Sequence, residues 1–176
     1  QVDLYICSLS CRSLIYKGMF LAEHLTEFYP DLLDERFVSR FAIYHQRYST
    51  NTFPTWKLAQ PFRRLAHNGA INTISGTITW MKRHETGVPP PDLDPWMADI
   101  KPLVQAGGSD TATLDNVFEL LTFAGRDAPS AKALMIPASV GGNAAMKPAH
   151  RDMFTYCNAV MEPWDGPAAL CATDGR

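Results

Sequence analysis

The sequence predicts an α+β fold in which helices cover a mixed β-sheet. Segments with strand-like spacing of apolar residues occur both early and late in the chain, and segments with helical spacing lie between them. The composition, with 46% apolar and 19% charged residues over 176 positions, is typical of a globular domain with a sizeable core. We therefore expect residues 1–176 to be part of a single domain.

The N-terminal quarter of the chain is predicted to be rich in strands. Val2–Ser10 and Ser13–Met19 have the composition of two consecutive strands, and Arg40–Ser49 alternates in a way that predicts a strand packed on both faces. Between them, Leu21–Phe28 has helical spacing and ends before Pro30.

Three longer segments are predicted to be helices. The first is Ile71–His84, and the last is Lys147–Val160. The clearest begins after Ser109 or Asp110, either of which can cap it, and Gly125 supplies its stop. The proline-rich segment 88–95 is predicted to be a surface connection, because proline interrupts both helix and strand hydrogen bonding.

The end of the chain is predicted to be a strand, Pro167–Ala172, followed by the hairpin signal Asp174–Gly175. No returning strand follows, and at the other end the first predicted strand starts almost at Gln1. We interpret the chain as an excerpt of a longer polypeptide that is incomplete at both ends. Unpaired sheet edges of this kind favour aggregation of the isolated chain.

The charge pattern and the cysteines exclude several classes of function. The formal net charge is −2 with charges of both signs interspersed, so neither nucleic acid nor a membrane surface is an expected partner. No membrane span or secretory signal is recognisable, which favours an intracellular location. Cys7, Cys11, Cys157 and Cys171 are sparse and lack metal-binding spacing, so we expect buried free thiols and no metal.

Arg47 is a candidate for binding a ligand carboxylate. A guanidinium in a predicted strand needs an acidic partner, and a ligand held by two parallel hydrogen bonds is one solution. From Arg47 alone, a structural ion pair with Asp or Glu is the favoured alternative. Thr50 can add a hydroxyl group to the same ligand, although taken singly it is typical of a turn.

Asn68, Gly69 and Asp110 complete the candidate site. Asn68–Gly69 is typical of a turn, but an Asn amide beside a glycine N–H can also form a pair of donors for a developing oxyanion. Asp110 can hold a ligand ammonium group, or it can be an ordinary helix cap. Together with Arg47 these residues match the two ends of an amino acid and a reacting amide, as in L-glutamine.

Several longer motifs resemble a known family. They are His45–Pro54 (HQRYSTNTFP), Leu58–Arg63 (LAQPFR), His67–Gly69 (HNG), Ser109–Asp110 (SD) and Met161–Pro167 (MEPWDGP). These motifs closely resemble the class II glutamine amidotransferase domain of the glutamate synthases, and the likeness runs in order over nearly all 176 residues.

The resemblance implies an N-terminal-nucleophile hydrolase fold, an αββα sandwich. In that family an N-terminal cysteine attacks the glutamine amide, and its own α-amino group acts as the base. By motif position, Asn68 and Gly69 would form the oxyanion hole, Arg47 and Thr50 would hold the glutamine carboxylate, and Asp110 the α-amino group. The nucleophile would lie upstream of Gln1, so the chain alone would be inactive.

The resemblance also implies partners and cofactors outside this chain. Ammonia would pass to 2-oxoglutarate in the full-length enzyme, which would use FMN and an iron–sulfur cluster and in some cases a small NAD(P)H-oxidising subunit. The expected location is the cytoplasm, or the chloroplast in a plant or alga. Ala70 departs from the family, which commonly has Glu there. Another class II amidotransferase and a catalytically silent glutamine-binding or interaction module are the alternatives.

Overall fold

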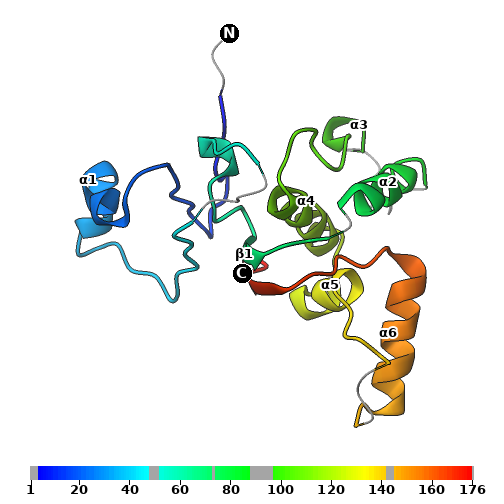
Figure 1. The fold of residues 1–176 in the computed structure, drawn as a ribbon. Coiled ribbons are helices and arrows are strands. Elements are labelled where there is room, and N and C mark those ends of the chain that lie inside the picture. Colours follow the sequence, from blue (N-terminus) through cyan, green and yellow to red (C-terminus); the bar gives the residue numbers. More distant parts are fainter. Residues whose placement is uncertain (1–3, 48–51, 73, 88–96, 142–144, 176) are drawn as a thin grey trace.

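A computed structural model shows a short β-sheet with helices gathered on one side of it and a largely irregular N-terminal segment on the other (Figure 1). The structure describes residues 4–47, 52–72, 74–87, 97–141 and 145–175. Within these ranges no helix is long and apolar enough to cross a lipid bilayer. The segments 88–95 and 48–51, and therefore Thr50, lie outside the described residues.

The helices and strands follow one another along the chain in the order that Figure 1 labels. They are the 3₁₀ turn Ala22–His24, α1 (Leu25–Phe28), the 3₁₀ turns Pro30–Leu33 and Trp56–Leu58, β1 (Leu65–Gly69), α2 (Ile74–His84), α3 (Met97–Ile100), α4 (Asp110–Phe123), α5 (Ala128–Met135), α6 (Pro148–Val160) and β2 (Ala168–Ala172).

The three predicted long helices are confirmed as α2, α4 and α6. Helix α4 begins where the Ser109 side chain accepts a hydrogen bond from Ala112 N at 3.1 Å. Helix α5 was not predicted, although its start carries the usual signals. Asp127 caps it by accepting from Ser130 N at 2.7 Å, and Pro129 stands in its first turn.

The predicted N-terminal strands are wrong. Residues 4–19 and 40–47 form no strand, and Leu21–Phe28 forms a 3₁₀ turn and one short helix. A strand exists only with a hydrogen-bonded neighbour, and the described residues offer none to these segments. The described residues form one two-stranded sheet, in which β1 pairs antiparallel with β2 and Leu65 faces Ala172. A mixed helix and strand fold is therefore present, and the αββα sandwich stays a prediction.

The hydrophobic core lies between β1 and the helices α2, α4, α5 and α6. Helix α5 packs against both α4 and α6, and α4 packs against β1. The apolar stripe predicted for α4 is largely buried. The fully buried residues of this core are Leu65, Met81, Val104, Leu114, Val117, Phe118, Ala131, Leu134, Met135, Cys157, Met161 and Trp164.

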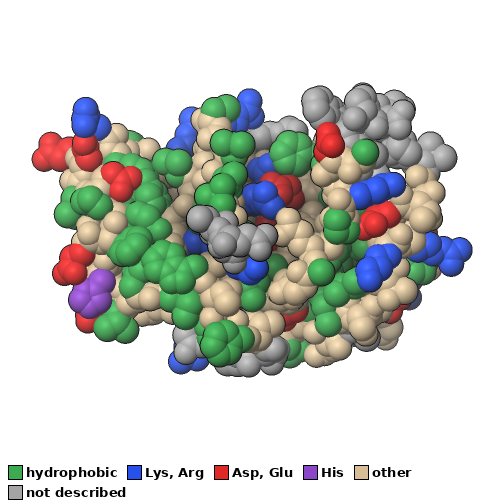
Figure 2. Space-filling model, turned by 90° about the horizontal axis from the view of Figure 1, so that it is seen from above, with side chains coloured by type: hydrophobic (Ala, Val, Ile, Leu, Met, Phe, Trp, Pro, Cys, Tyr) green, Lys and Arg blue, Asp and Glu red, His purple; other side chains and the backbone are tan. Residues whose placement is uncertain are grey.

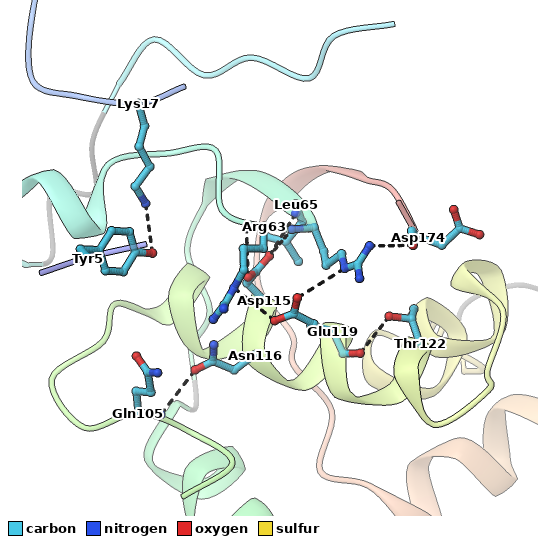
Figure 3. A network of polar contacts seen from close by, with 11 residues as sticks. Tyr5, Lys17, Arg63, Leu65, Gln105, Asp115, Asn116, Glu119, Thr122 and Asp174 are labelled. Atoms are coloured by element: carbon cyan, nitrogen blue, oxygen red, sulfur yellow. Dashed lines mark hydrogen bonds and ion pairs between the residues drawn. The ribbon is translucent and has the colours of Figure 1, made fainter. Parts of the chain in front are cut away.

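A buried carboxylate joins β1 to α4 (Figure 3). Asp115 on α4 is 1% exposed and accepts hydrogen bonds from Arg64 N at 2.8 Å and Leu65 N at 3.1 Å, with Arg63 N at 3.3 Å. One turn along α4, Glu119 pairs with the Arg63 side chain at 3.2 Å. Burial raises the pKa of Asp115 to about 6, although the backbone N–H groups favour the ionised form.

The Gln60 side chain satisfies further backbone groups on the edge of β1 that faces away from β2. Gln60 donates to His67 O at 2.8 Å and accepts from His67 N at 2.7 Å, so its amide replaces the backbone of a neighbouring strand. Phe62 N bonds Leu65 O at 2.9 Å. The polar groups of Leu65 and His67 that face away from β2 are therefore satisfied within the chain.

The N-terminal segment leaves many apolar side chains exposed. Figure 2 shows hydrophobic side chains concentrated on the half of the molecule that carries this segment. A monomeric soluble protein seldom exposes so continuous an apolar surface. The exposed large hydrophobic residues of this segment include Leu4, Leu9, Leu14, Leu33, Val38, Tyr44 and Phe53.

We predict that Asp115→Asn changes how stability depends on pH. The pKa of Asp115 in the folded chain, about 6, lies above its ordinary value of 3.8, so the folded state binds the proton more tightly. The stability that this group contributes is present below pH 4 and is lost as pH rises through 6, by up to about 3 kcal/mol. Denaturant unfolding at pH 4 and 7.5 tests this, and equal pH dependence of both chains would contradict it.

We predict that the isolated chain associates with itself, because its N-terminal segment exposes a broad apolar surface. Sedimentation velocity over a range of concentrations should show species larger than a monomer. A replacement of Leu9 and Leu14 by Ser should shift the distribution toward monomer. A monodisperse monomer that melts cooperatively would show the prediction to be wrong.

Candidate functional site

Asn68 and Gly69 are the last two residues of β1 and do not form a turn. They lie opposite Ala169 and Ala168 of β2, and both are exposed. Gly69 has a φ of +133°, and a Cβ there would collide with the carbonyl oxygen of Pro167. Glycine is therefore required for the close approach of two backbones, rather than for a turn.

The segment Met161–Pro167 lies beside the end of β1. Ala70 N donates to Pro167 O at 3.2 Å, and Asn72 N donates to Asp165 O at 3.0 Å. Gly166 has a φ of +156°, and a Cβ there would meet the backbone oxygen of Ala70. The two motifs HNG and MEPWDGP, about 95 residues apart in sequence, therefore form one backbone junction.

Asp110 is not the cap of α4, because Ser109 takes that role. The Asp110 carboxylate accepts from Thr111 N at 2.7 Å through Oδ1 and from Ile71 N at 3.4 Å through Oδ2. It is half-buried. The alternative of an ordinary N-cap is wrong, and the structure brings this carboxylate next to the segment that follows Asn68–Gly69.

Arg47 is exposed and lies outside any strand, so the expectation of a buried guanidinium is wrong. Among the described residues it forms no ion pair, which removes support for a structural partner. Its backbone N–H donates to His45 Nδ1 at 3.1 Å. Arg47 lines a groove of about 1660 Å³ between the N-terminal segment and residues 59–65.

The structure unites part of the candidate site. Asn68 and Gly69 end β1, and Asp110 at the start of α4 bonds Ile71, two residues after Gly69, so the three residues lie in the same region. Arg47 lies on the groove at the other side of β1, and none of those three residues lines it. His45 is close enough to His67 for its charge to lower the pKa of His67, after burial as the main cause.

Sequence reasoning missed the polar residues that hold the site. Asp115, Gln60 and His67 are buried, and each bonds β1 or α4. In the sequence each of them is a polar residue beside an apolar neighbour. Such a residue can be recognised as a candidate for a buried hydrogen bond.

Lys17 was also missed. It is 4% exposed, its Nζ donates to Lys57 O at 2.9 Å, and it lies 4.6 Å from the ring centre of Phe62. Burial lowers the pKa of Lys17 to about 8. The ammonium group ties the N-terminal segment to residues 57–62, which lead into β1.

The cysteines are all free thiols, but only Cys157 is buried, and Cys11 and Cys171 are exposed. The expectation of four buried thiols is therefore wrong for these two. Within the described ranges no three His, Cys, Asp or Glu side chains come together as a metal site would require. The residues present do not fit an iron–sulfur cluster.

We predict that Gly69→Ala destabilises the chain by at least about 2 kcal/mol, because its Cβ has no room beside Pro167 and its φ is positive. Gly107→Ala is the matched control, since Gly107 also has a positive φ, +75°, but no atom lies within 4 Å of its Cβ position. Denaturant unfolding of both variants separates the two causes. An equal loss in both would contradict the close-contact explanation.

Comparisons with known proteins agree with the motifs. The family model "Glutamine amidotransferases class-II" matches residues 1–176. The chain is 62% identical over 174 residues to a "Glutamate synthase [NADPH] large chain" of Azospirillum brasilense, covering 99% of this chain and 12% of that protein. It is 44% identical over 177 residues to a "Ferredoxin-dependent glutamate synthase, chloroplastic" of Oryza sativa subsp. japonica, covering 99% of this chain and 11% of that protein.

A third relative supports the same grouping. The "Glutamate synthase [NADPH] large chain" of Bacillus subtilis (strain 168) is 43% identical over 175 residues, again with 99% of this chain and 12% of the relative covered. The chain therefore spans 11% to 12% of the length of these relatives. The resemblance inferred from the motifs is confirmed, and the chain belongs to the class II glutamine amidotransferase family.

Proposed function

We propose that this chain is the glutaminase part of a glutamate synthase large chain, which hydrolyses L-glutamine to L-glutamate and ammonia. The observation that carries the proposal is the position of Asp110. Because Ser109 caps α4, the Asp110 carboxylate does not serve as the cap. It accepts a hydrogen bond from the backbone of Ile71, two residues after the Asn68–Gly69 pair. This position supports the proposal, because it would put a carboxylate near a pair of amide-binding donors at one end of β1, as an amino-acid amide requires.

The two charged groups of glutamine, which are attached to the same carbon, are assigned to Asp110 and Arg47. Asp110 would accept hydrogen bonds from the α-ammonium group, and an ammonium–carboxylate contact is among the stronger hydrogen bonds. Arg47 would hold the α-carboxylate, for which its exposed guanidinium has no competing ion pair among the described residues. Thr50, three residues on, would add a hydroxyl group to the same carboxylate.

Asn68 and Gly69 are assigned to the amide carbonyl. The Asn68 side-chain amide and the Gly69 N–H would donate to the oxygen of the tetrahedral intermediate. The attacking group would be the thiol of an N-terminal cysteine, with its own α-amino group as base. The amide C–N bond would break as ammonia takes a proton and leaves, and water would then hydrolyse the thioester.

The chemistry proposed for this chain needs no cofactor. FMN and an iron–sulfur cluster would serve the amination of 2-oxoglutarate in the remaining domains of the polypeptide. Those domains, and in an NADPH-dependent enzyme a small NAD(P)H-oxidising subunit, would be its partners. The cytoplasm is the proposed location, or the chloroplast in a plant or alga, as in the rice relative named above.

We predict that this chain releases no ammonia from L-glutamine, whereas a chain extended upstream to an N-terminal cysteine does. A coupled ammonia assay measures both, and Cys→Ala at that terminus is the control. Activity of residues 1–176 alone would place the nucleophile among the four cysteines of this chain. Glutamine binding without ammonia release by the extended chain would favour the silent binding module.

We predict that Asp110→Asn in the extended chain raises the KM for L-glutamine about 10- to 100-fold, because a hydrogen bond between charged groups contributes roughly 1.5–3 kcal/mol. Asp152→Asn, on the exposed face of α6, is the matched control and should leave KM unchanged. Steady-state kinetics measure both variants. An unchanged KM in Asp110→Asn would remove Asp110 from the binding site.

A further inference from the structure

A line of polar contacts connects β1 to Asp110. His67 Nδ1, on the strand residue before Asn68, lies 2.9 Å from Thr111 Oγ1, and Thr111 Oγ1 donates to Asp110 Oδ1 at 3.3 Å. His67 is 3% exposed and Thr111 is 2% exposed. These two buried groups therefore span the gap between the strand that carries Asn68–Gly69 and the carboxylate at the start of α4.

The chemistry of the groups sets the direction of these hydrogen bonds. A carboxylate accepts and does not donate, so the single hydroxyl proton of Thr111 points to Asp110. His67 Nδ1 must then carry a proton and donate it to Thr111 Oγ1. The pKa of His67 is lowered, mainly by burial, which favours a neutral ring. The hydrogen bond to Thr111 assigns the one proton of that ring to Nδ1.

Both ends of the line are held in place by other contacts. The backbone of His67 is fixed by two hydrogen bonds with the buried Gln60 amide, at 2.7 and 2.8 Å. At the other end, the Asp110 carboxylate also accepts from Thr111 N and Ile71 N. Oδ1 thus has two donors from Thr111, so the rotation of the carboxylate is set and Oδ2 is left with one weak donor.

We propose that His67 and Thr111 are positioning residues that orient the Asp110 carboxylate toward the substrate α-ammonium group and fix its spacing from Asn68–Gly69. The inference rests on the proposed glutaminase function. Neither residue touches the substrate. Thr111 acts by holding Oδ1, so that Oδ2 faces the ligand, and His67 acts by fixing the Thr111 hydroxyl proton.

The test uses the full-length polypeptide that contains this chain, with ammonia release measured for two substrates. One is L-glutamine, and the other is glutaramate, which has the same amide and carboxylate but no α-amino group. Thr111→Val removes the hydroxyl group at nearly constant volume. Thr113→Val is the matched control, because Thr113 is equally buried on the same helix but its hydroxyl group donates, within the described part of the chain, to Ser109 O at 2.9 Å and not to Asp110.

We expect Thr111→Val to raise the KM for L-glutamine about 10-fold with little change in kcat, and to leave kcat/KM for glutaramate unchanged. Thr111→Ser should restore the KM, and Thr113→Val should not alter it. His67→Phe should raise the KM for L-glutamine as Thr111→Val does. His67→Asn should raise the KM less than His67→Phe, because the Asn amide nitrogen can take the place of Nδ1.

The outcomes separate this inference from the proposed function. If the unaltered polypeptide releases no ammonia from glutamine, the proposed function is wrong. If it does, an equal loss of kcat/KM for glutamine and glutaramate in Thr111→Val shows a general structural role and overturns the inference. An unchanged KM for glutamine in a Thr111→Val protein with unaltered unfolding behaviour overturns it as well.

Discussion

The buried carboxylate of Asp115 is the contact on which the arrangement of this chain depends. Its two oxygens accept from successive backbone N–H groups at the entrance of β1, which satisfies donors that no strand covers there. The cost of burying the charge is offset by these bonds and by nearby Arg63. Because Asp115 belongs to α4, the contact sets the position of β1 relative to that helix. Asn68 and Gly69 lie on β1, and Asp110 begins α4, so these candidate groups belong to the two elements that this contact joins.

A second constraint acts at the other end of β1, where two backbones pass too closely for side chains. Gly69 faces Pro167, and Gly166 faces Ala70, each without room for a Cβ. Buried Trp164 fixes this segment through its backbone N–H, which donates a hydrogen bond to Met135 O at 2.8 Å. The strand is thus held at its start by a carboxylate and at its end by close packing. Such double fixation suits the oxyanion-binding role proposed for Asn68 and Gly69, since the donors of an oxyanion hole must be in place before charge develops.

The helices were largely predictable and the strands were not. Helices α2, α4 and α6 follow from residue periodicity and local caps, because a helix satisfies its hydrogen bonds within one segment. Strand β2 followed from its composition and the hairpin signal beside it, but β1 was missed because its HNG motif is typical of a turn. The composition of Val2–Ser10 and Ser13–Met19 and the alternation in Arg40–Ser49 predicted strands that the described residues 4–19 and 40–47 do not form. A strand needs a partner, and local sequence carries no information on whether one is present.

By itself the sequence determined the family and helices α2, α4 and α6, and its motifs indicated the residues to which the proposed function assigns glutamine binding: Arg47, Thr50, Asn68, Gly69 and Asp110. These follow from motifs and spacing, which are local properties of the chain. Only the tertiary structure decided that Ser109 rather than Asp110 caps α4, that Gly69 serves a close backbone contact, and that His67, Thr111 and Gln60 support the site. The supporting roles of Gln60, His67 and Thr111 depend on hydrogen bonds between residues 7 and 44 positions apart. The bond between His67 and Thr111 exists only once hydrophobic burial has brought β1 against α4.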